Sequence, residues 1–215
     1  MRQADSFLSA IVLAAGASVR MGRPKQLLTL GDRCLLQHVL DAVETSRLNE
    51  LVLVLGCRMD EIRAAVRLPA GLAARVVVNP DYARGQSSSL RSGLQAANPR
   101  SVAAGILLGD QPQITAALID RVADAFLAAA TPIVRPMYTG VTGRVPGHPV
   151  FLAREIWPAV GRLAGDEGAR ALIATHPEWL TDVAVAGDAP ADIDTADDYE
   201  RVVDIMRGEK IRALS

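Results

Sequence analysis

Aromatic side chains are scarce in this chain, at 4% of its 215 residues. Proteins that bind single-stranded nucleic acid stack bases on aromatic rings, so this shortage argues against that class. An excess of positive charge is also missing, because 23 Lys and Arg residues are balanced by 24 Asp and Glu residues without a long basic block. A protein held to nucleic acid by a broad basic face is therefore not expected either.

Cysteine is represented only by Cys34 and Cys57, which lie far apart and form no CxxC pair. We interpret both as buried or half-buried thiols in a reducing cytosol. Long apolar runs are missing too. The run at residues 10–15 is too short to cross a bilayer, and it lacks the basic flank and upstream layout of a signal peptide. We therefore expect a cytoplasmic protein without a membrane partner.

Short apolar runs alternate with longer amphipathic stretches along the chain. Most of the short runs are continuous in Val, Ile and Leu, which is typical of parallel strands buried on both faces. The expected strands are residues 10–15, 50–56, 74–79, 103–109, 132–135 and 181–186. Between them, apolar residues at helical spacing predict helices around residues 36–43 and 118–126. The pattern predicts an α/β fold with three layers, a mostly parallel sheet with helices on both faces, and one domain over residues 1–215.

Residues 136–152 break this alternation, because they are rich in Gly, Pro and Thr and have no helical period. We expect a hairpin or an extended flap over the sheet in this part of the domain.

Ligands of open α/β sheets bind beyond the carboxyl ends of the strands. Four segments follow expected strands and are predicted to converge on one crevice. They begin "AGASVRMGRPK" after the first strand, "NPDYARGQSSSLRSGL" after the third, "GDQP" after the fourth and "GDAPADIDTADDY" after the last.

The first of these segments has the residues of a phosphate-binding loop. Gly16 allows a tight turn in which consecutive N–H groups form a concavity for an anion. Arg20 adds a planar fork for phosphate oxygens, and Lys25 adds a compact charge. The loop is neither a Walker A motif nor a G-x-G-x-x-G dinucleotide fingerprint. The alternative interpretation is an ordinary turn after a strand, with solvated cations.

The same stretch resembles the signature of the nucleotidyltransferase superfamily that includes the sugar-nucleotide pyrophosphorylases. Within this MobA-like superfamily, the sequence is most similar to the molybdenum cofactor cytidylyltransferases. The pattern L-A-A-G-x-S-x-R-M-G-x-x-K is matched by Leu13, Ala14, Ala15, Gly16, Ser18, Arg20, Met21, Gly22 and Lys25. The resemblance implies a Rossmann-like fold of the nucleotide-diphospho-sugar transferase type, and a loop that holds the triphosphate of CTP. Ala15 replaces the second glycine of the guanylyl-transferring relatives, and its methyl group would crowd a purine.

The resemblance continues at residues 84–94, "RGQSSSLRSGL". There Gly85, Ser88 and Ser89 match a segment that recognises the nucleotide base in the family. The alternative interpretation is a helix start capped by one of the three serines, and both interpretations are compatible.

A metal site is predicted from two acidic motifs. Asp110 in "LLGDQP" follows a buried strand, and Mg²⁺ prefers carboxylate oxygens together with substrate phosphates. The resemblance implies that Asp110 binds Mg²⁺ or Mn²⁺, and that Asp194 or Asp192 in "ADIDTADDY" provides a second ligand. The alternatives are an Asx turn at Asp110 and a helix start at the second motif, where a capping box accounts for the residues just after Asp194.

Two further motifs, "GHPVF" at 147–151 and "GDEGAR" at 165–170, also resemble the family. His148 is expected either to contact the acceptor substrate or to form structural hydrogen bonds in its loop. Asp166 is interpreted as the cap of a helix.

Taken together, the resemblance implies transfer of CMP from CTP to the phosphate of molybdenum-molybdopterin, with release of pyrophosphate. Arg20, Lys25 and Asp110 would be the catalytic residues, and a molybdenum hydroxylase would be a client of the product. Two alternatives stay open. One is a nonclassical NAD(P)H reductase on the same fold, and the other is a molybdenum cofactor chaperone without turnover that serves an oxidase of the xanthine dehydrogenase type.

Overall fold

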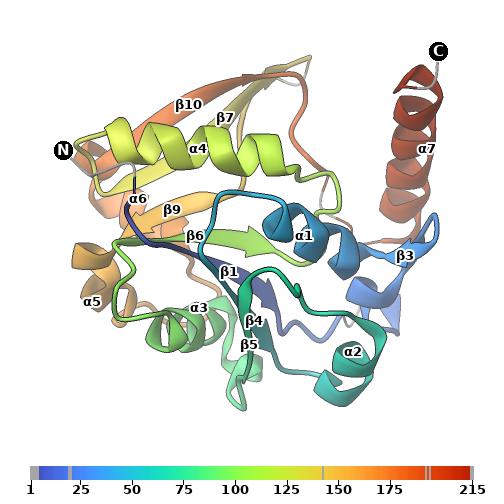
Figure 1. Cartoon of the computed structure of the whole chain (residues 1–215), viewed down its shortest axis with the longest axis horizontal. Helices are drawn as coiled ribbons and strands as arrows, with labels where there is room; N and C mark the ends of the chain where they lie inside the picture. Colours follow the sequence, from blue (N-terminus) through green and yellow to red (C-terminus); the bar gives the residue numbers. More distant parts are fainter. Residues whose placement is uncertain (1–4, 19–20, 142, 192, 194, 214–215) are drawn as a thin grey trace.

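The computed structural model describes residues 5–18, 21–141, 143–191, 193 and 195–213. Its centre is an eight-stranded sheet in the order β10-β7-β9-β6-β1-β4-β5, with β8 paired to β7 (Figure 1). The strands are β1 (Leu8–Ala14), β4 (Glu50–Leu55), β5 (Ala73–Val78), β6 (Ala103–Leu108), β7 (Ile133–Gly140), β8 (Gly143–Pro146), β9 (Val150–Ala153) and β10 (Leu180–Ala186).

Most neighbouring strands run parallel, so the expected mostly parallel sheet is confirmed. The pairs β6–β1, β1–β4, β4–β5 and β7–β10 are parallel, whereas β9 is antiparallel to both β6 and β7. All six expected strands are present. The prediction was wrong about where the fifth ends, because β7 continues to Gly140 and pairs with β8 in a hairpin. It also missed β9, where the Phe151 ring packs flat against Gly105 of β6.

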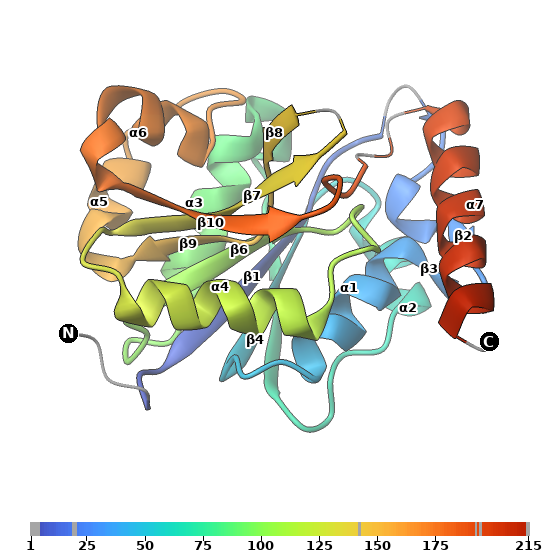
Figure 2. The same cartoon turned by 90° about the horizontal axis from the view of Figure 1, so that it is seen from above.

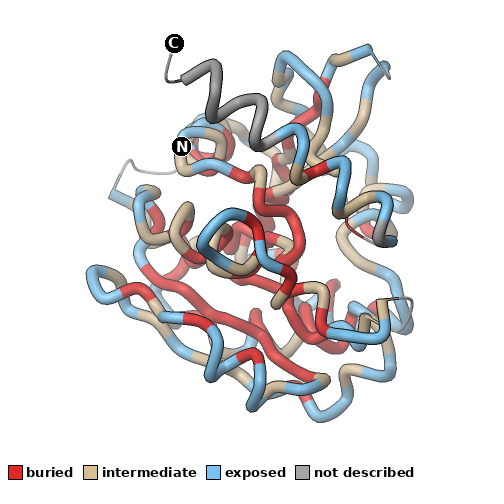
Figure 3. Tube along the Cα trace, turned by 90° about the vertical axis from the view of Figure 1, so that its right-hand side faces the viewer, coloured by how far each residue is buried: buried red, intermediate tan, exposed pale blue. Residues whose placement is uncertain are grey.

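Helices cover both faces of the sheet, which makes the three layers (Figure 2). One face carries α1 (Leu35–Glu44), α2 (Met59–Ala65) and α4 (Ala116–Ala128), and the other carries α3 (Gln86–Ala96), α5 (Trp157–Val160) and α6 (Ala169–Thr175). Side chains of β1 alternate between the two cores: Ala10 and Val12 belong to the first, Ile11 and Leu13 to the second. The central strands are buried along their length (Figure 3), which explains why they are continuous apolar runs.

A third, smaller apolar cluster lies at one side of the sheet. There the helix α7 (Ala196–Ala213) packs beside a short hairpin formed by β2 (Thr29–Leu30) and β3 (Arg33–Cys34), as Figure 1 shows. Val202 of α7 meets Leu28 and Leu30, and Ile193 fills the same cluster. The segment that follows β10 is thereby held against the loop that follows β1. Across the described residues, no helix has the length and apolar character needed to cross a membrane.

One buried hydroxyl gives a test of the packing around β7 and β8. Tyr138 of β7 is 5% exposed, and its Oη has no hydrogen-bond partner among the described residues. Burial raises the pKa of this phenol to about 12, from an ordinary value of 10.0. The folded protein therefore keeps its proton where the unfolded chain releases it, so Tyr138 lowers stability as the pH rises from 10 towards 12.

We expect Tyr138→Phe to reduce this alkaline loss of stability by an amount on the order of 1–3 kcal/mol. Near pH 7 the change should be within about 1 kcal/mol, since the hydroxyl makes no hydrogen bond that would be lost. Urea unfolding at several pH values from 7 to about 11.5 measures both effects. An identical alkaline slope in the variant and the wild type would show that the phenol is hydrated in the native state.

Candidate active site

A cavity of about 650 Å³ lies beyond the carboxyl ends of β1 and β6 and beside the start of α3. The residues that line it are Leu13, Ala15, Gly16, Ala17, Ser18, Met21, Lys25, Gln26, Tyr82, Ala83, Gly85, Gln86, Ser89, Leu108, Asp110 and Asp166. Three of the four segments expected to converge therefore do so. The fourth, after β10, reaches the neighbouring cluster, where Ile193 packs with the side chains around Leu28.

The loop after β1 is held in shape by two polar side chains. Gln26 is 3% exposed, and its Nε2 donates to the carbonyl oxygens of Ala14 at 3.3 Å and Gly16 at 3.5 Å. Ser18 has a positive φ of 50°, and its Oγ accepts the backbone N–H of Lys25 at 3.1 Å. The loop is thus closed on itself, with Gly16 and Ser18 at the cavity. The sequence analysis missed Gln26, whose position next to Lys25 was the available signal.

A half-buried ion pair joins the two loops of the predicted catalytic centre. Lys25 Nζ lies 2.5 Å from Asp110 Oδ2, and the side chains are 19% and 11% exposed. Lys25 begins the short 3₁₀ helix Lys25–Leu27, and Asp110 follows β6, which is hydrogen-bonded to β1. The structure thus brings two of the three predicted catalytic residues into contact. The third, Arg20, lies outside the described residues.

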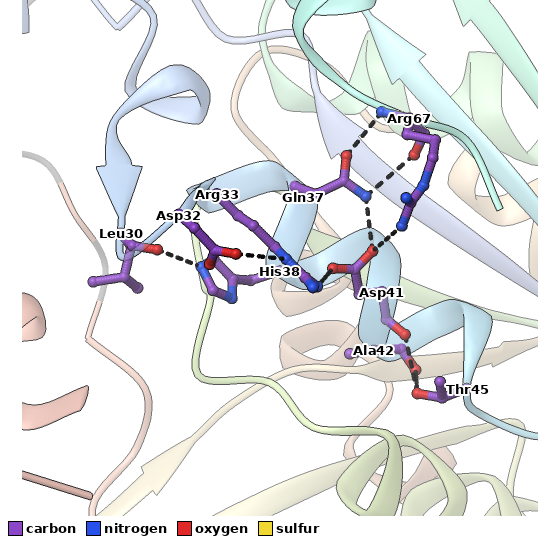
Figure 4. A network of polar contacts seen from close by, with 9 residues as sticks. All are labelled: Leu30, Asp32, Arg33, Gln37, His38, Asp41, Ala42, Thr45 and Arg67. Carbon is purple, nitrogen blue, oxygen red and sulfur yellow. Dashed lines mark hydrogen bonds and ion pairs between the residues drawn. The ribbon is translucent and has the colours of Figure 1, made fainter. Parts of the chain in front are cut away.

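A polar network fixes the hairpin that follows Lys25 (Figure 4). Asp41 of α1 forms an ion pair with Arg33 of β3 and accepts a hydrogen bond from Gln37 Nε2 at 2.8 Å. A ring nitrogen of His38 lies 2.9 Å from the carbonyl oxygen of Leu30. These contacts anchor β2 and β3 to α1, which explains the structural role of His38.

The start of α3 forms another part of the cavity wall. Ser89 lines the cavity and accepts a hydrogen bond from Asn79 Nδ2 at 3.0 Å. Ser88 points elsewhere: its Oγ accepts from the same Nδ2 at 2.8 Å and lies within donating distance of the carbonyl oxygens of Asp81 and Gly85. Of the three residues predicted to bind nucleotide here, Gly85 and Ser89 are at the cavity and Ser88 closes the turn before the helix.

Tyr82 is a wall residue that sequence analysis missed. Gly56 has no room for a Cβ, which would lie 2.6 Å from Cβ of Tyr82, so this side chain packs directly on the end of β4. A hydrogen bond with the Cys57 thiol raises the pKa of the Tyr82 phenol above its usual value. The backbone N–H of Cys57 in turn donates to Ala15 at 3.2 Å, which joins this wall to the glycine loop.

The other predicted site residues, Asp192, Asp194 and His148, are not among the described residues that line the cavity. Asp192 and Asp194 lie outside the described residues. Just after them, the expected capping box is present, since the N–H of Thr195 donates to Asp198 Oδ2 at 3.0 Å and the N–H of Asp198 donates to Thr195 Oγ1 at 3.2 Å. His148 is half-buried between β8 and β9 and is not among the residues that line the cavity.

The carboxylate of Asp110 fits a hard divalent cation that is held partly by the protein and partly by the phosphates of the nucleotide. Within the described residues, no three His, Cys, Asp or Glu side chains gather into a complete metal site. Mg²⁺ commonly takes one or two carboxylates and completes its shell with water and phosphate oxygens. A single carboxylate at the edge of an open cavity is compatible with that mode of binding.

The chain is similar to known proteins over most of its length. Residues 10–180 match the family model described as "MobA-like NTP transferase domain". Nicotine blue oxidoreductase of Paenarthrobacter nicotinovorans is 31% identical over 205 residues, which cover 91% of this chain and 96% of that protein.

Solved structures show the same fold. The crystal structure of Rv0371c from Mycobacterium tuberculosis H37Rv is 35% identical, with a TM-score of 0.81, and covers 94% of this chain and 100% of its own. A second structure of that protein, a complex with manganese, is 34% identical with a TM-score of 0.76, and covers 92% and 98% of the two chains. A nucleotidyl transferase from Methanothermobacter, 24% identical with a TM-score of 0.73 over 92% and 96% of the chains, shares the fold.

Proposed function

Because the chain belongs to the MobA-like NTP transferase family, we propose that it transfers CMP from CTP to the phosphate of molybdenum-molybdopterin. The products are the cytosine dinucleotide form of the cofactor and pyrophosphate. The observation that carries this proposal is the single cavity that contains the Gly16 loop, the Lys25–Asp110 pair and the start of α3. The triphosphate of a nucleotide is bound by backbone N–H groups and cations. The base needs a separate surface of the cavity to contact.

The chemistry requires position and charge rather than a strong base. An oxygen of the acceptor phosphate forms a bond to the α-phosphorus of CTP, and the bond from that phosphorus to the bridging oxygen breaks as pyrophosphate leaves. The attacking phosphate is already ionised near neutral pH, so no side chain has to remove a proton. Lys25 and, by the family resemblance, Arg20 would hold the phosphates and stabilise the charge that moves to the leaving group.

Asp110 would hold Mg²⁺ or Mn²⁺, with Asp194 or Asp192 as the second carboxylate implied by the resemblance. The metal supplies Lewis-acid stabilisation of the charge on the phosphate oxygens. The manganese complex of the relative from M. tuberculosis, 34% identical, supports a divalent cation in this role. Asp110 contributes by lying at the end of β6, where packing on β1 fixes its position.

Selection of CTP is attributed to the walls of the cavity. Ala15 is 5% exposed, and its methyl group narrows the loop where a glycine would leave room for a purine. Gly85 and Ser89 offer backbone and hydroxyl groups at the start of α3 for contacts with the base. His148 is kept as a candidate for the acceptor side, in the turn before β9.

A second candidate function is reduction of a small aromatic substrate with NAD(P)H. It is favoured by one observation, the relative called nicotine blue oxidoreductase, which is similar over 91% of this chain. The retained Lys25 and Asp110 argue for the nucleotidyl transfer, because a hydride transfer needs no carboxylate for a metal.

The test is release of pyrophosphate with each of the four NTPs, with and without molybdenum cofactor, in the presence of Mg²⁺ or Mn²⁺. We expect release with CTP only when the acceptor is present. A parallel assay follows oxidation of NADH and NADPH with a quinonoid dye. Dye reduction without pyrophosphate release would establish the reductase, and efficient use of GTP would contradict the cytidylyl assignment.

A further inference from the structure

The "GDEGAR" segment, residues 165–170, has no part in the proposed chemistry, yet its first residues pack against the start of α3. The backbone N–H of Ser87 donates to the carbonyl oxygen of Gly165 at 3.1 Å, and the N–H of Gln86 lies 3.3 Å from Asp166 Oδ1. Arg91 of α3 reinforces the contact by donating to the carbonyl oxygen of Leu163 at 2.9 Å. Asp166 therefore caps α3, a helix that begins 80 residues earlier in the chain.

Close packing fixes the backbone that carries this exposed carboxylate. Gly85 has a positive φ of 101°, and a Cβ on it would lie 2.2 Å from the carbonyl carbon of Gly165 and 2.7 Å from the backbone nitrogen of Asp166. Only glycine permits this approach between the two segments. Asp166 is consequently a defined part of the cavity wall, beside Gly85, Gln86 and Ser89.

The carboxylate lines the same cavity as Lys25 and Asp110, on a segment that packs against the start of α3. Under the proposed function, the phosphates contact Lys25 and a metal on Asp110, and the base contacts Gly85 and Ser89, which line the cavity together with Asp166. Oδ1 of Asp166 accepts a hydrogen bond from the backbone N–H of Gln86. Oδ2 has no hydrogen bond within the described part of the chain. An ionised carboxylate only accepts hydrogen bonds. This wall therefore offers an acceptor to whatever edge of the base reaches it.

We propose that Asp166 is a specificity residue that accepts a hydrogen bond from the exocyclic amino group of cytosine and disfavours uracil. Cytosine presents a donor at N4, to which Asp and Glu are suited acceptors, whereas a uracil-type base presents the acceptor O4 at the same position. If uracil occupied this position, its O4 would face a carboxylate oxygen of Asp166. Both atoms are acceptors, so neither would gain a hydrogen bond. This inference rests on the proposed function and adds discrimination between two pyrimidines, which the Ala15 methyl cannot provide.

Asp166→Asn is the decisive variant. The Asn Oδ1 retains the capping acceptor for Gln86, because Asn is as good a cap as Asp, while its NH₂ group offers a donor to O4 of uracil. We expect the affinity for CTP to fall and that for UTP to rise. The ratio of the two should change by about 5- to 150-fold, which is the range for one good base contact. Calorimetry with each nucleotide measures this ratio, and kcat/KM for pyrophosphate release measures it independently.

Two further variants separate recognition from other effects. Asp166→Ala should weaken CTP because it removes the acceptor. It should improve UTP less than Asp166→Asn does, because it removes the opposing oxygen but supplies no donor to O4. Glu167→Gln removes the same charge one residue away, at a side chain that accepts from the N–H of Ala164 at 3.2 Å and does not line the cavity, and it should leave the ratio unchanged.

The outcomes distinguish this inference from the proposed function. A wild type that uses CTP, together with an Asp166→Asn protein that keeps the wild-type ratio of CTP to UTP, would overturn the role of Asp166 alone. A wild type that binds neither nucleotide would overturn both proposals. An equal shift of the ratio in Glu167→Gln would show that the effect is one of net charge and would contradict direct recognition.

Discussion

Asp110→Asn should lower metal-dependent pyrophosphate release by at least about 100- to 1000-fold, the range for loss of one preorganised charge-stabilising group. A neutral amide is a much poorer ligand for a hard cation than a carboxylate. The fold should survive, because the Asn oxygen can still accept a hydrogen bond from Lys25 Nζ, which lies 2.5 Å from the carboxylate in the wild type. Steady-state kinetics at several Mg²⁺ concentrations, together with thermal unfolding, checks both statements.

A half-buried ion pair elsewhere in the molecule provides a matched control for this variant. Arg135 Nε lies 2.9 Å from Asp182 Oδ1, with side chains 16% and 26% exposed, across the β7–β10 ladder. Asp182→Asn should alter stability to a similar degree and leave turnover intact. Full activity of Asp110→Asn at low Mg²⁺ would mean that Asp110 only closes the turn after β6.

Lys25→Met should have opposite effects on the two ligands of the cavity. CTP should bind about 10- to 150-fold more weakly, since a charge-assisted phosphate contact is worth roughly 1.5–3 kcal/mol. Mn²⁺ alone should bind about fivefold more tightly, because Asp110 no longer pairs with an ammonium group, and a partly exposed ion pair contributes up to about 1 kcal/mol. In the wild type, a metal ion would compete with Lys25 for Asp110 unless a polyphosphate offered the Lys25 side chain other oxygens. Calorimetry with CTP and electron paramagnetic resonance titration with Mn²⁺ measure the two affinities.

Arg23→Met is the control for this second variant. Arg23 lies on the same loop, is exposed and does not line the cavity. Its replacement by Met removes one positive charge, as Lys25→Met does. Both affinities should stay close to the wild type in this protein. If Lys25→Met also left both unchanged, Lys25 would be removed from the site, and the contact with Asp110 would be a surface pair without consequence.

Features that depend on one segment at a time were predictable from the sequence. A strand buried on both faces has to be apolar at every position, and a surface helix has to be apolar at helical spacing, so the runs at β1 and β4 and the stripes of α1 and α4 identify these elements. The motif residues of the loop after β1 could also be recognised from the sequence alone. Their proximity to Asp110 was predictable too, because the carboxyl ends of parallel strands share one edge of a sheet.

Local patterns leave the role of a residue open where a second segment decides it. The serines at the start of α3 are indistinguishable in sequence, yet Ser89 lines the cavity while Ser88 is bonded to the turn before the helix. His148 stands in a motif that resembles the family, but it is not among the residues that line the cavity.

The class of fold, the positions of the main strands and helices, and the loop that carries Lys25 follow from local patterns in the chain. Three features appear only in the folded chain: β9 enters the sheet antiparallel between β6 and β7, Gln26 closes the loop, and Asp166 caps α3 at the cavity. Periodicity shows which faces of an element are buried, but it does not show which element covers them. The cost of closing a long loop grows only slowly with its length, so contacts between distant segments are selected by the packing of the whole chain.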